Sequence, residues 1–305
     1  MAELVPLPFA HLLRRVLVEW ERQRRIFDLP ERSFWAGSPL DLSVSFHGAR
    51  AATGVGPAAG PHSQLAQNIA LSWLAGARVV ELKTIQVADR LKLPRPCIDA
   101  TNVGYNVEWS QELRLEESLL EYVKAWVLVH LLASLNPARL RPSELSTLFD
   151  LSVGYSLAGI RSEPVWRWLD ALRDARPLIA RLFNELPPDL AAIADVAVPA
   201  RVSDCVTLST FHGCPAGEIE AIARHLLERH DVHVIIKCNP TLLGHETVAT
   251  LLGDRLGYDD IRLHAPAFAE DLRFEDLLDM LGRLEEVAKR VGRSIGVKLT
   301  NTLVV

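Results

Sequence analysis

Cysteine and lysine are scarce in this sequence, and it contains no long apolar run. The four cysteines form no CxxC pair, so we expect no zinc site and no iron–sulfur cluster held by this chain alone. No run of about 18 apolar residues occurs, and no basic segment followed by an apolar one opens the chain, so neither a membrane span nor a signal peptide is expected. A net charge of −5 gives no electrostatic footprint for nucleic acid or an anionic membrane. We therefore expect a cytoplasmic protein that binds neither nucleic acid nor membrane.

What the sequence does contain is a regular alternation of two patterns. Six glycine-punctuated, β-branched runs are typical of strands, and stretches with apolar residues at helical spacing lie between them. The predicted strands are at residues 52–60, 77–86, 148–156, 204–213, 231–240 and 293–302. The predicted helices are at residues 62–76, 116–135, 165–186, 216–230 and 274–292. This succession predicts a parallel sheet covered by helices, either an open doubly wound sheet or a barrel.

The region before Gly54 differs in kind. Residues 4–35 are predicted to form a helix and a loop, and "LDLSVSFHGARAA" (residues 40–52) alternates like a short hairpin. We therefore divide the chain into an N-terminal helix and hairpin extension, residues 1–53, and a barrel region, residues 54–305.

Lysines mark the ends of three predicted strands. Of the six lysines, Lys83, Lys237 and Lys298 lie inside or at the end of apolar β runs. The carboxyl ends of parallel strands form the functional face of α/β folds. A lysine there can present a fixed positive charge to an anionic ring or phosphate. The alternative is a lysine that reaches from a strand end to water.

The glycine-rich run "GVGPAAGPH" (residues 54–62) lacks side chains that would block close approach of the backbone to a ligand. It does not have the GxGxxG spacing of dinucleotide-binding proteins. A tight structural turn explains it almost as well.

Taken together, these phrases resemble a known family. "GPAAGPHSQLAQNI", "ELKTIQ", "TLSTFHGCPAGEIEAI", "NPTLLG" and "GVKLTNTL" occur in this order and cover almost the whole chain. They are similar to the dihydroorotate dehydrogenase-like flavin barrels, and within them to the family named as selenate reductase subunits, which resembles the flavin domain of dihydropyrimidine dehydrogenase. The resemblance implies a (β/α)8 TIM-type barrel of which about six of the eight strands are present here.

The resemblance also implies an FMN site and a role for each matching residue. Ala58, Ala59 and Gly60 would form the backbone wall that receives the flavin, Lys83 and Thr84 would contact the ring and substrate, and Lys237 would face the N1 and O2 edge of the ring. Substrate contacts would come from Asn106, Asn301 and Thr302. No counterpart is assigned to Lys298. We expect Lys83, Cys214, Lys237 and Asn301 to converge at one rim of the sheet.

Cys214, in "STFHGCPAGEIE", is the candidate acid or base of this site, with Lys83 as the other catalytic candidate. In the family that it resembles, a cysteine over the flavin moves a proton while hydride passes to or from the ring. Pro215 can begin a helix, and the positive end of a helix would lower the pKa of the thiol. His212 is the alternative proton donor, and a half-buried structural cysteine is the alternative role for Cys214.

The sequence departs from the family pattern in two ways. One bears on the substrate, and the other bears on how much of the barrel this chain contains. The pyrimidine-binding relatives have asparagines where this chain has "TLST" and Ala216, so we expect poor discrimination for orotate or uracil. The phosphate of FMN is commonly held after the seventh and eighth strands. We therefore expect the chain to be the amino-terminal portion of a longer polypeptide. The resemblance implies that iron–sulfur clusters and a dinucleotide bind in regions absent here.

Three functions remain open at this point. The first is a flavin-dependent oxidoreductase that passes electrons between other redox subunits or domains and a small-molecule substrate. The second is a non-catalytic barrel that organises a multi-subunit redox complex. The third is an aldolase that uses Lys237 as a Schiff-base amine.

Overall fold

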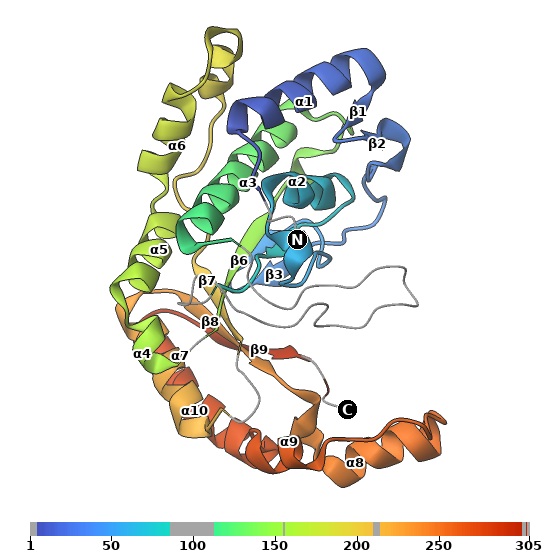
Figure 1. The fold of residues 1–305 in the computed structure, drawn as a ribbon, viewed down its shortest axis with the longest axis vertical. Helices are drawn as coiled ribbons and strands as arrows, with labels where there is room; N and C mark the ends of the chain where they lie inside the picture. The colour runs from blue at the N-terminus through green and yellow to red at the C-terminus, as the bar shows by residue number, and fades with distance from the viewer. Residues whose placement is uncertain (1–4, 86–112, 155, 210–213, 301–302, 304–305) are drawn as a thin grey trace. The chain divides into compact units, whose positions relative to one another are not determined.

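The computed structural model describes residues 5–85, 113–154, 156–209, 214–300 and 303 (Figure 1). The chain divides into two compact units. The N-terminal unit comprises Met1–Ser152 and Glu163–Asp204, and the C-terminal unit comprises Val153–Ser162 and Cys205–Val305. The boundary predicted after residue 53 stays a prediction.

Two short hairpins and a helix open the N-terminal unit. The helix α1 (Phe9–Gln23) ends at Arg24, and β1 (Arg25–Ile26) then pairs antiparallel with β2 (Leu29–Pro30). The 3₁₀ helix η1 spans Glu31–Ser33. The predicted helix is thus confirmed, and the predicted loop contains a hairpin.

The second hairpin, β3 (Val44–Phe46) and β4 (Ala49–Ala51), confirms the one predicted over residues 40–52. Its two turn residues, His47 and Gly48, both have positive φ, at 48° and 81°. Such a turn matches the right-handed twist of the two strands that it joins.

The first predicted strand, over residues 52–60, is wrong. This segment runs beside β5 (Val79–Glu81) as irregular chain: the Arg78 N–H donates to the Val55 carbonyl (2.9 Å) and the Glu81 N–H to the Pro57 carbonyl (3.1 Å). Proline has no N–H for a ladder and glycine is a poor strand former, so the segment accepts bonds from β5 without becoming a strand.

Glycine is required at one position of this irregular segment. A Cβ placed on Gly56 would lie 1.5 Å from the carbonyl oxygen of Val79. Gly56 therefore lets the segment lie directly against β5.

The core of the N-terminal unit is a parallel strand pair covered by helices. β6 (Leu148–Val153) pairs parallel with β5, with Glu81 opposite Asp150. β6 is buried along almost its whole length, as parallel strands are. Along the chain, η2 (Pro61–Ser63) and α2 (Ala66–Leu74) precede β5, whereas α3 (Leu115–Leu135) and η4 (Pro142–Glu144) lie between β5 and β6.

The helix α3 contacts α2 (Figure 1). Its residues 121–129 are all buried, so this middle part is not amphipathic as the apolar spacing predicts. It holds a buried ion pair, Glu121 with Lys124 (2.7 Å), and Glu121 also accepts the N–H of Ala66 (2.8 Å) at the start of α2. Within the described residues, α3 is the one helix whose length and composition would suit a membrane span, and 67% of its apolar window is buried, as in a core helix.

Two helices complete the N-terminal unit where one helical stretch is predicted. α5 (Glu163–Arg173) and α6 (Arg176–Asn184) are separate because the chain turns at Ala175, whose N–H donates to the Ala200 carbonyl (2.7 Å). The 3₁₀ helix η5 (Pro188–Asp195) follows.

The C-terminal unit contains a three-stranded parallel sheet in the order β7 (Cys205–Ser209), β8 (His233–Cys238) and β9 (Ile295–Leu299). With β5 and β6, five of the six predicted strands are confirmed. Two helices connect the strands, α7 (Ala216–Arg229) after β7 and α10 (Phe274–Arg290) before β9, and they pack against each other. The short helix α4 spans Leu157–Ile160.

A longer excursion leaves the sheet after β8. It contains η6 (Pro240–Leu243), α8 (His245–Thr250), a π-helical turn η7 (Leu251–Arg255) and α9 (Ala265–Glu270). At the opposite strand ends, Arg293 bonds both oxygens of Asp231 (2.7 Å each), which ties the start of β9 to the start of β8.

Candidate functional site

Cys214 and Lys237 line one cavity at the carboxyl end of β8. Lys237 is the penultimate residue of this strand, and Cys214 lies two residues before α7 begins at Ala216. The cavity is lined by Cys214, Ile219, Lys237, Cys238, Asn239, Thr241, Leu242, Asp271 and Leu272. Its volume of ≈ 10 Å³ suits about one water molecule. The structure thus brings together two of the residues predicted for the site.

Three polar residues of this cavity were not predicted. Asp271 Oδ2 accepts hydrogen bonds from Asn239 Nδ2 (3.2 Å) and Thr241 Oγ1 (2.8 Å), and all three side chains are buried. Asn239 and Thr241 directly follow the strand that carries Lys237, so their position at a strand end is the signal that points to them. Asp271 has no such signal, because it reaches the cavity from far along the chain.

The environment of Cys214 corrects the expected direction of its pKa shift. Burial raises the pKa of the thiol to about 11, and the negative charges of Glu218 and Asp271 add to this effect. Glu218 lies in the first turn of α7 and opposes the positive end of that helix. Cys214 is therefore a protonated thiol at neutral pH, which can donate a proton and is a poor nucleophile.

Lys298, to which the family resemblance assigns no role, is the Cα partner of Lys237 across β8 and β9. Residues paired in this way project from the same face of a sheet. Two lysine side chains therefore lie in one row on one face, and the row continues to Ser209 of β7.

The other predicted site residues lie in the N-terminal unit. Lys83 is buried, 5% exposed, just beyond β5, where its backbone oxygen accepts the Tyr122 hydroxyl (2.8 Å). Thr84 Oγ1 bonds Ser152 Oγ at the end of β6 (2.8 Å). Both therefore lie at strand carboxyl ends, as predicted.

Two backbone amides of the turn at Ala58, Ala59 and Gly60 donate hydrogen bonds within the chain. The Ala59 N–H donates to Glu81 Oε2 (2.8 Å), and the Gly60 N–H donates to Ser63 Oγ (3.2 Å). At Ala59 and Gly60 this turn can therefore offer a ring its small apolar surface rather than hydrogen-bond donors.

Asn106, Asn301, Thr302 and His212 lie outside the described residues. The convergence of Lys83, Cys214, Lys237 and Asn301 stays a prediction. Within the described ranges, no group of three or more His, Cys, Asp or Glu side chains could hold a metal ion.

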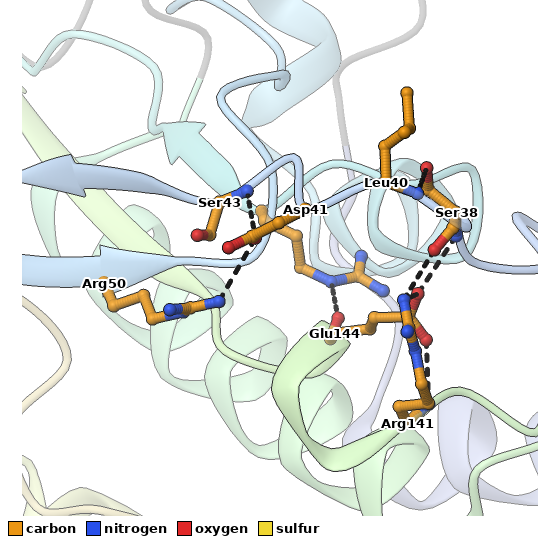
Figure 2. Close-up of polar contacts among 8 residues, drawn as sticks. Ser38, Leu40, Asp41, Ser43, Arg50, Arg141 and Glu144 are labelled. Carbon is orange, nitrogen blue, oxygen red and sulfur yellow. Dashed lines mark hydrogen bonds and ion pairs between the residues drawn. The ribbon is translucent and has the colours of Figure 1, made fainter.

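A larger cavity, of ≈ 260 Å³, lies at the other strand ends of the N-terminal unit. It is lined by Trp35, the segment 38–42, Arg50, Ala52, Arg141, Ser143 and Glu144. Figure 2 shows two ion pairs that line it: Glu144 accepts hydrogen bonds from the Ser38 N–H (3.0 Å) and the Arg141 guanidinium (2.7 Å), and Asp41 accepts one from Arg50 (3.3 Å). Glu144 precedes the amino end of β6, where residues of α/β barrels serve stability. We interpret it as a structural clamp.

We expect the Glu144 clamp to make the stability of the folded protein sensitive to acid. The Arg141 guanidinium, with the amides of Ser38 and Arg141, lowers the pKa of Glu144 from 4.5 to about 2. Because the folded-state pKa is the lower one, the stabilisation is complete above pH 4.5 and is lost as the pH falls toward about 2. Glu144→Gln should therefore lower the midpoint of thermal unfolding near neutral pH, and this deficit should shrink below pH 4.5.

Thermal unfolding followed from neutral pH into acid measures this deficit. Glu116→Gln, which neutralises an exposed carboxylate on α3, is the control. A Glu144→Gln deficit of the same size at both ends of the pH range would assign the effect to packing instead of charge.

The sequence of this chain is similar to those of known proteins. The family model "Oxidoreductase YgfK, N-terminal TIM-barrel domain" matches residues 27–305. Two relatives named "Putative oxidoreductase YgfK", from Escherichia coli K12 and Escherichia coli O157:H7, are each 45% identical to the chain over 320 residues. The match covers 98% of this chain, which spans 30% of the length of those relatives.

Proposed function

Because the chain belongs to the family of the oxidoreductase YgfK N-terminal TIM-barrel domain, we propose that it forms part of a dihydroorotate dehydrogenase-like, flavin-dependent barrel. The prediction of an oxidoreductase barrel family is confirmed by the family match. The observation that supports a flavin reaction is the shared cavity of Cys214 and Lys237 at a strand carboxyl end.

The chemistry of the donor set fits FMN. Lys237 and Lys298 place two positive charges in one row of a sheet face, which suits the negative edge of a flavin ring. For Ala58, Ala59, Gly60, Lys83 and Thr84 we propose the flavin-contacting roles that the family resemblance implies. FMN would supply two-electron hydride chemistry.

The chain's own contribution to the proposed reaction is a proton held on Sγ of Cys214. Burial and the neighbouring carboxylates keep that proton on Sγ of Cys214 at neutral pH. Together with a hydride, this proton would complete the two-electron reduction of a small substrate. Lys237 fixes positive charge in the same cavity, whose small volume excludes bulk water.

The source of electrons and the substrate are proposals for the full-length protein. We propose that iron–sulfur clusters and a dinucleotide in its other regions supply the electrons, and that it acts in the cytoplasm. The substitution of "TLST" and Ala216 for asparagines favours a substrate other than a pyrimidine. Selenate stays a candidate substrate on the family resemblance alone.

Flavin content tests the proposal directly. We expect the full-length protein purified without added flavin to show a flavin absorption spectrum, and Lys237→Ala to reduce the bound flavin or slow its reduction. Lys289→Ala, an exposed lysine of α10 paired with glutamates, should leave both unchanged.

The alternatives give different results in the same experiments. A full-length protein without flavin would support the scaffold hypothesis and contradict ours. Covalent trapping of a carbonyl substrate on Lys237 by borohydride would instead support the aldolase hypothesis.

A further inference from the structure

The excursion after β8 returns to the point from which it leaves. It departs at Asn239 and Pro240, passes through α8 and α9, and reaches Asp271, the residue that directly follows α9. One oxygen of Asp271 accepts hydrogen bonds from both Asn239 and Thr241. This single carboxylate thus joins the two ends of the segment 240–270.

This joint, formed by Asn239, Thr241 and Asp271, is buried. Asn239 is 8% exposed, Thr241 5% and Asp271 7%. Hydrogen bonds to an ionised acceptor are about twice as strong as those between neutral groups, and water does not compete for buried ones. The two bonds are therefore well placed to hold the segment against the end of β8.

The joint is also part of the wall around Cys214. Asn239, Thr241 and Asp271 line the cavity together with Cys214 and Lys237. The charge of Asp271 contributes to the raised pKa of the Cys214 thiol, after burial and Glu218. Within the described residues, the titratable groups facing Cys214 are Glu218 from α7, Lys237 and Cys238 from β8, and Asp271.

We propose that Asp271 is a positioning residue for the proton donor Cys214: it anchors both ends of the segment 240–270 and fixes Asn239 and Thr241 in the cavity wall. Its negative charge also disfavours the thiolate, so Cys214 keeps its proton until substrate accepts it. This assignment rests on the proposed function for the identity of the donor.

Three variants of the full-length protein separate the anchoring from the charge. Asp271→Asn removes the charge and keeps an acceptor oxygen, whereas Asp271→Ala removes both. Glu218→Gln removes the other nearby charge and leaves the bonds to Asn239 and Thr241 in place.

Two measurements distinguish these variants, and neither requires bound flavin or turnover. Hydrogen exchange of the amides in 240–270 should be faster in Asp271→Ala by at least about tenfold and change less in Asp271→Asn, because local opening follows the loss of anchoring bonds. The pH dependence of Cys214 alkylation, followed by mass spectrometry of its peptide, should shift to lower pH in both Asp271 variants and in Glu218→Gln. Glu218→Gln should leave exchange in 240–270 unchanged.

Unchanged exchange in Asp271→Ala, or an unchanged alkylation profile in Asp271→Asn, would overturn the assignment. If Asp271→Ala does not fold, as exchange in β8 and α7 would show, the comparison of Asp271→Asn with Glu218→Gln still decides whether the charge acts on Cys214. A protein without flavin would contradict the proposed function and leave these two measurements intact.

Discussion

Under the proposed flavin-dependent function, replacing Cys214 by alanine is expected to slow turnover of the full-length protein by about 10²–10⁴-fold, the usual contribution of a positioned acid or base, and to leave its flavin content unchanged. The thiol lies 3% exposed in a cavity with Lys237 and three polar side chains. Its proton matters during the reaction, whereas the lysines carry the charge that would hold the ring. Turnover and flavin absorbance of the same preparation measure the two effects.

Cys205→Ala is the matched control for this substitution. Cys205 is also 3% exposed, but it lies at the first residue of β7, the strand end opposite the cavity. The control variant should lose some stability and turn over substrate at the parent rate. Equal rates for Cys214→Ala and the parent would make Cys214 a structural cysteine.

The pH profile separates a proton donor from a nucleophile. A thiol with a pKa of about 11 remains protonated through the neutral range, so an acid-catalysed rate should be flat there and fall only as the pH approaches about 11. A thiolate nucleophile would instead give a rate that rises steadily with pH.

The sequence predicts the parts of this site that depend on strand ends. Lys237 and Cys214 come together because each belongs to the carboxyl end of a parallel strand, and such ends share one edge of a sheet. The β-branched runs around these residues are strong strand formers. The same argument places Lys83 and Thr84 correctly at the end of β5.

The parts that were missed depend on distant contacts. Asp271 joins Asn239 and Thr241 across about 30 residues of chain, and no local pattern encodes such a contact. The pKa of Cys214 was predicted from the helix that follows it, yet burial, Glu218 and Asp271 act in the opposite direction. Local sequence patterns predict a helix or strand and where it ends, whereas tertiary packing determines the pKa of Cys214.

The error at the first strand has a different cause. Residues 52–60 do lie beside β5, where a first strand was expected, but glycine and proline prevent a regular ladder. A glycine-punctuated run predicts a strand only where β-branched residues lie between the glycines, and this run contains few of them. The segment lies where the first strand is predicted, but its backbone does not form the predicted strand.

Gly56→Ala is expected to lower the free energy of unfolding by about 3 kcal/mol or more. A Cβ at this position would lie 1.5 Å from the Val79 carbonyl oxygen, and both atoms are bound to backbone, so no side-chain rotation relieves the overlap. The segment would have to move away from β5. Three backbone hydrogen bonds would then be lost, two to Val55 and one to Pro57, each worth roughly 1 kcal/mol.

Thermal unfolding measures the loss, and hydrogen exchange locates it. Amides of β5 should exchange faster in Gly56→Ala, whereas those of β8 in the C-terminal unit should not. Gly282→Ala is the control with the opposite sign: this glycine is exposed in α10 with nothing within 4 Å of an added Cβ, so the variant should gain about 0.5–1 kcal/mol from helix propensity. If Gly56→Ala unfolded at the parent temperature, segment 54–60 could not lie as close to β5 as the structure shows, and the proposed wall at Ala58, Ala59 and Gly60 would lose its support.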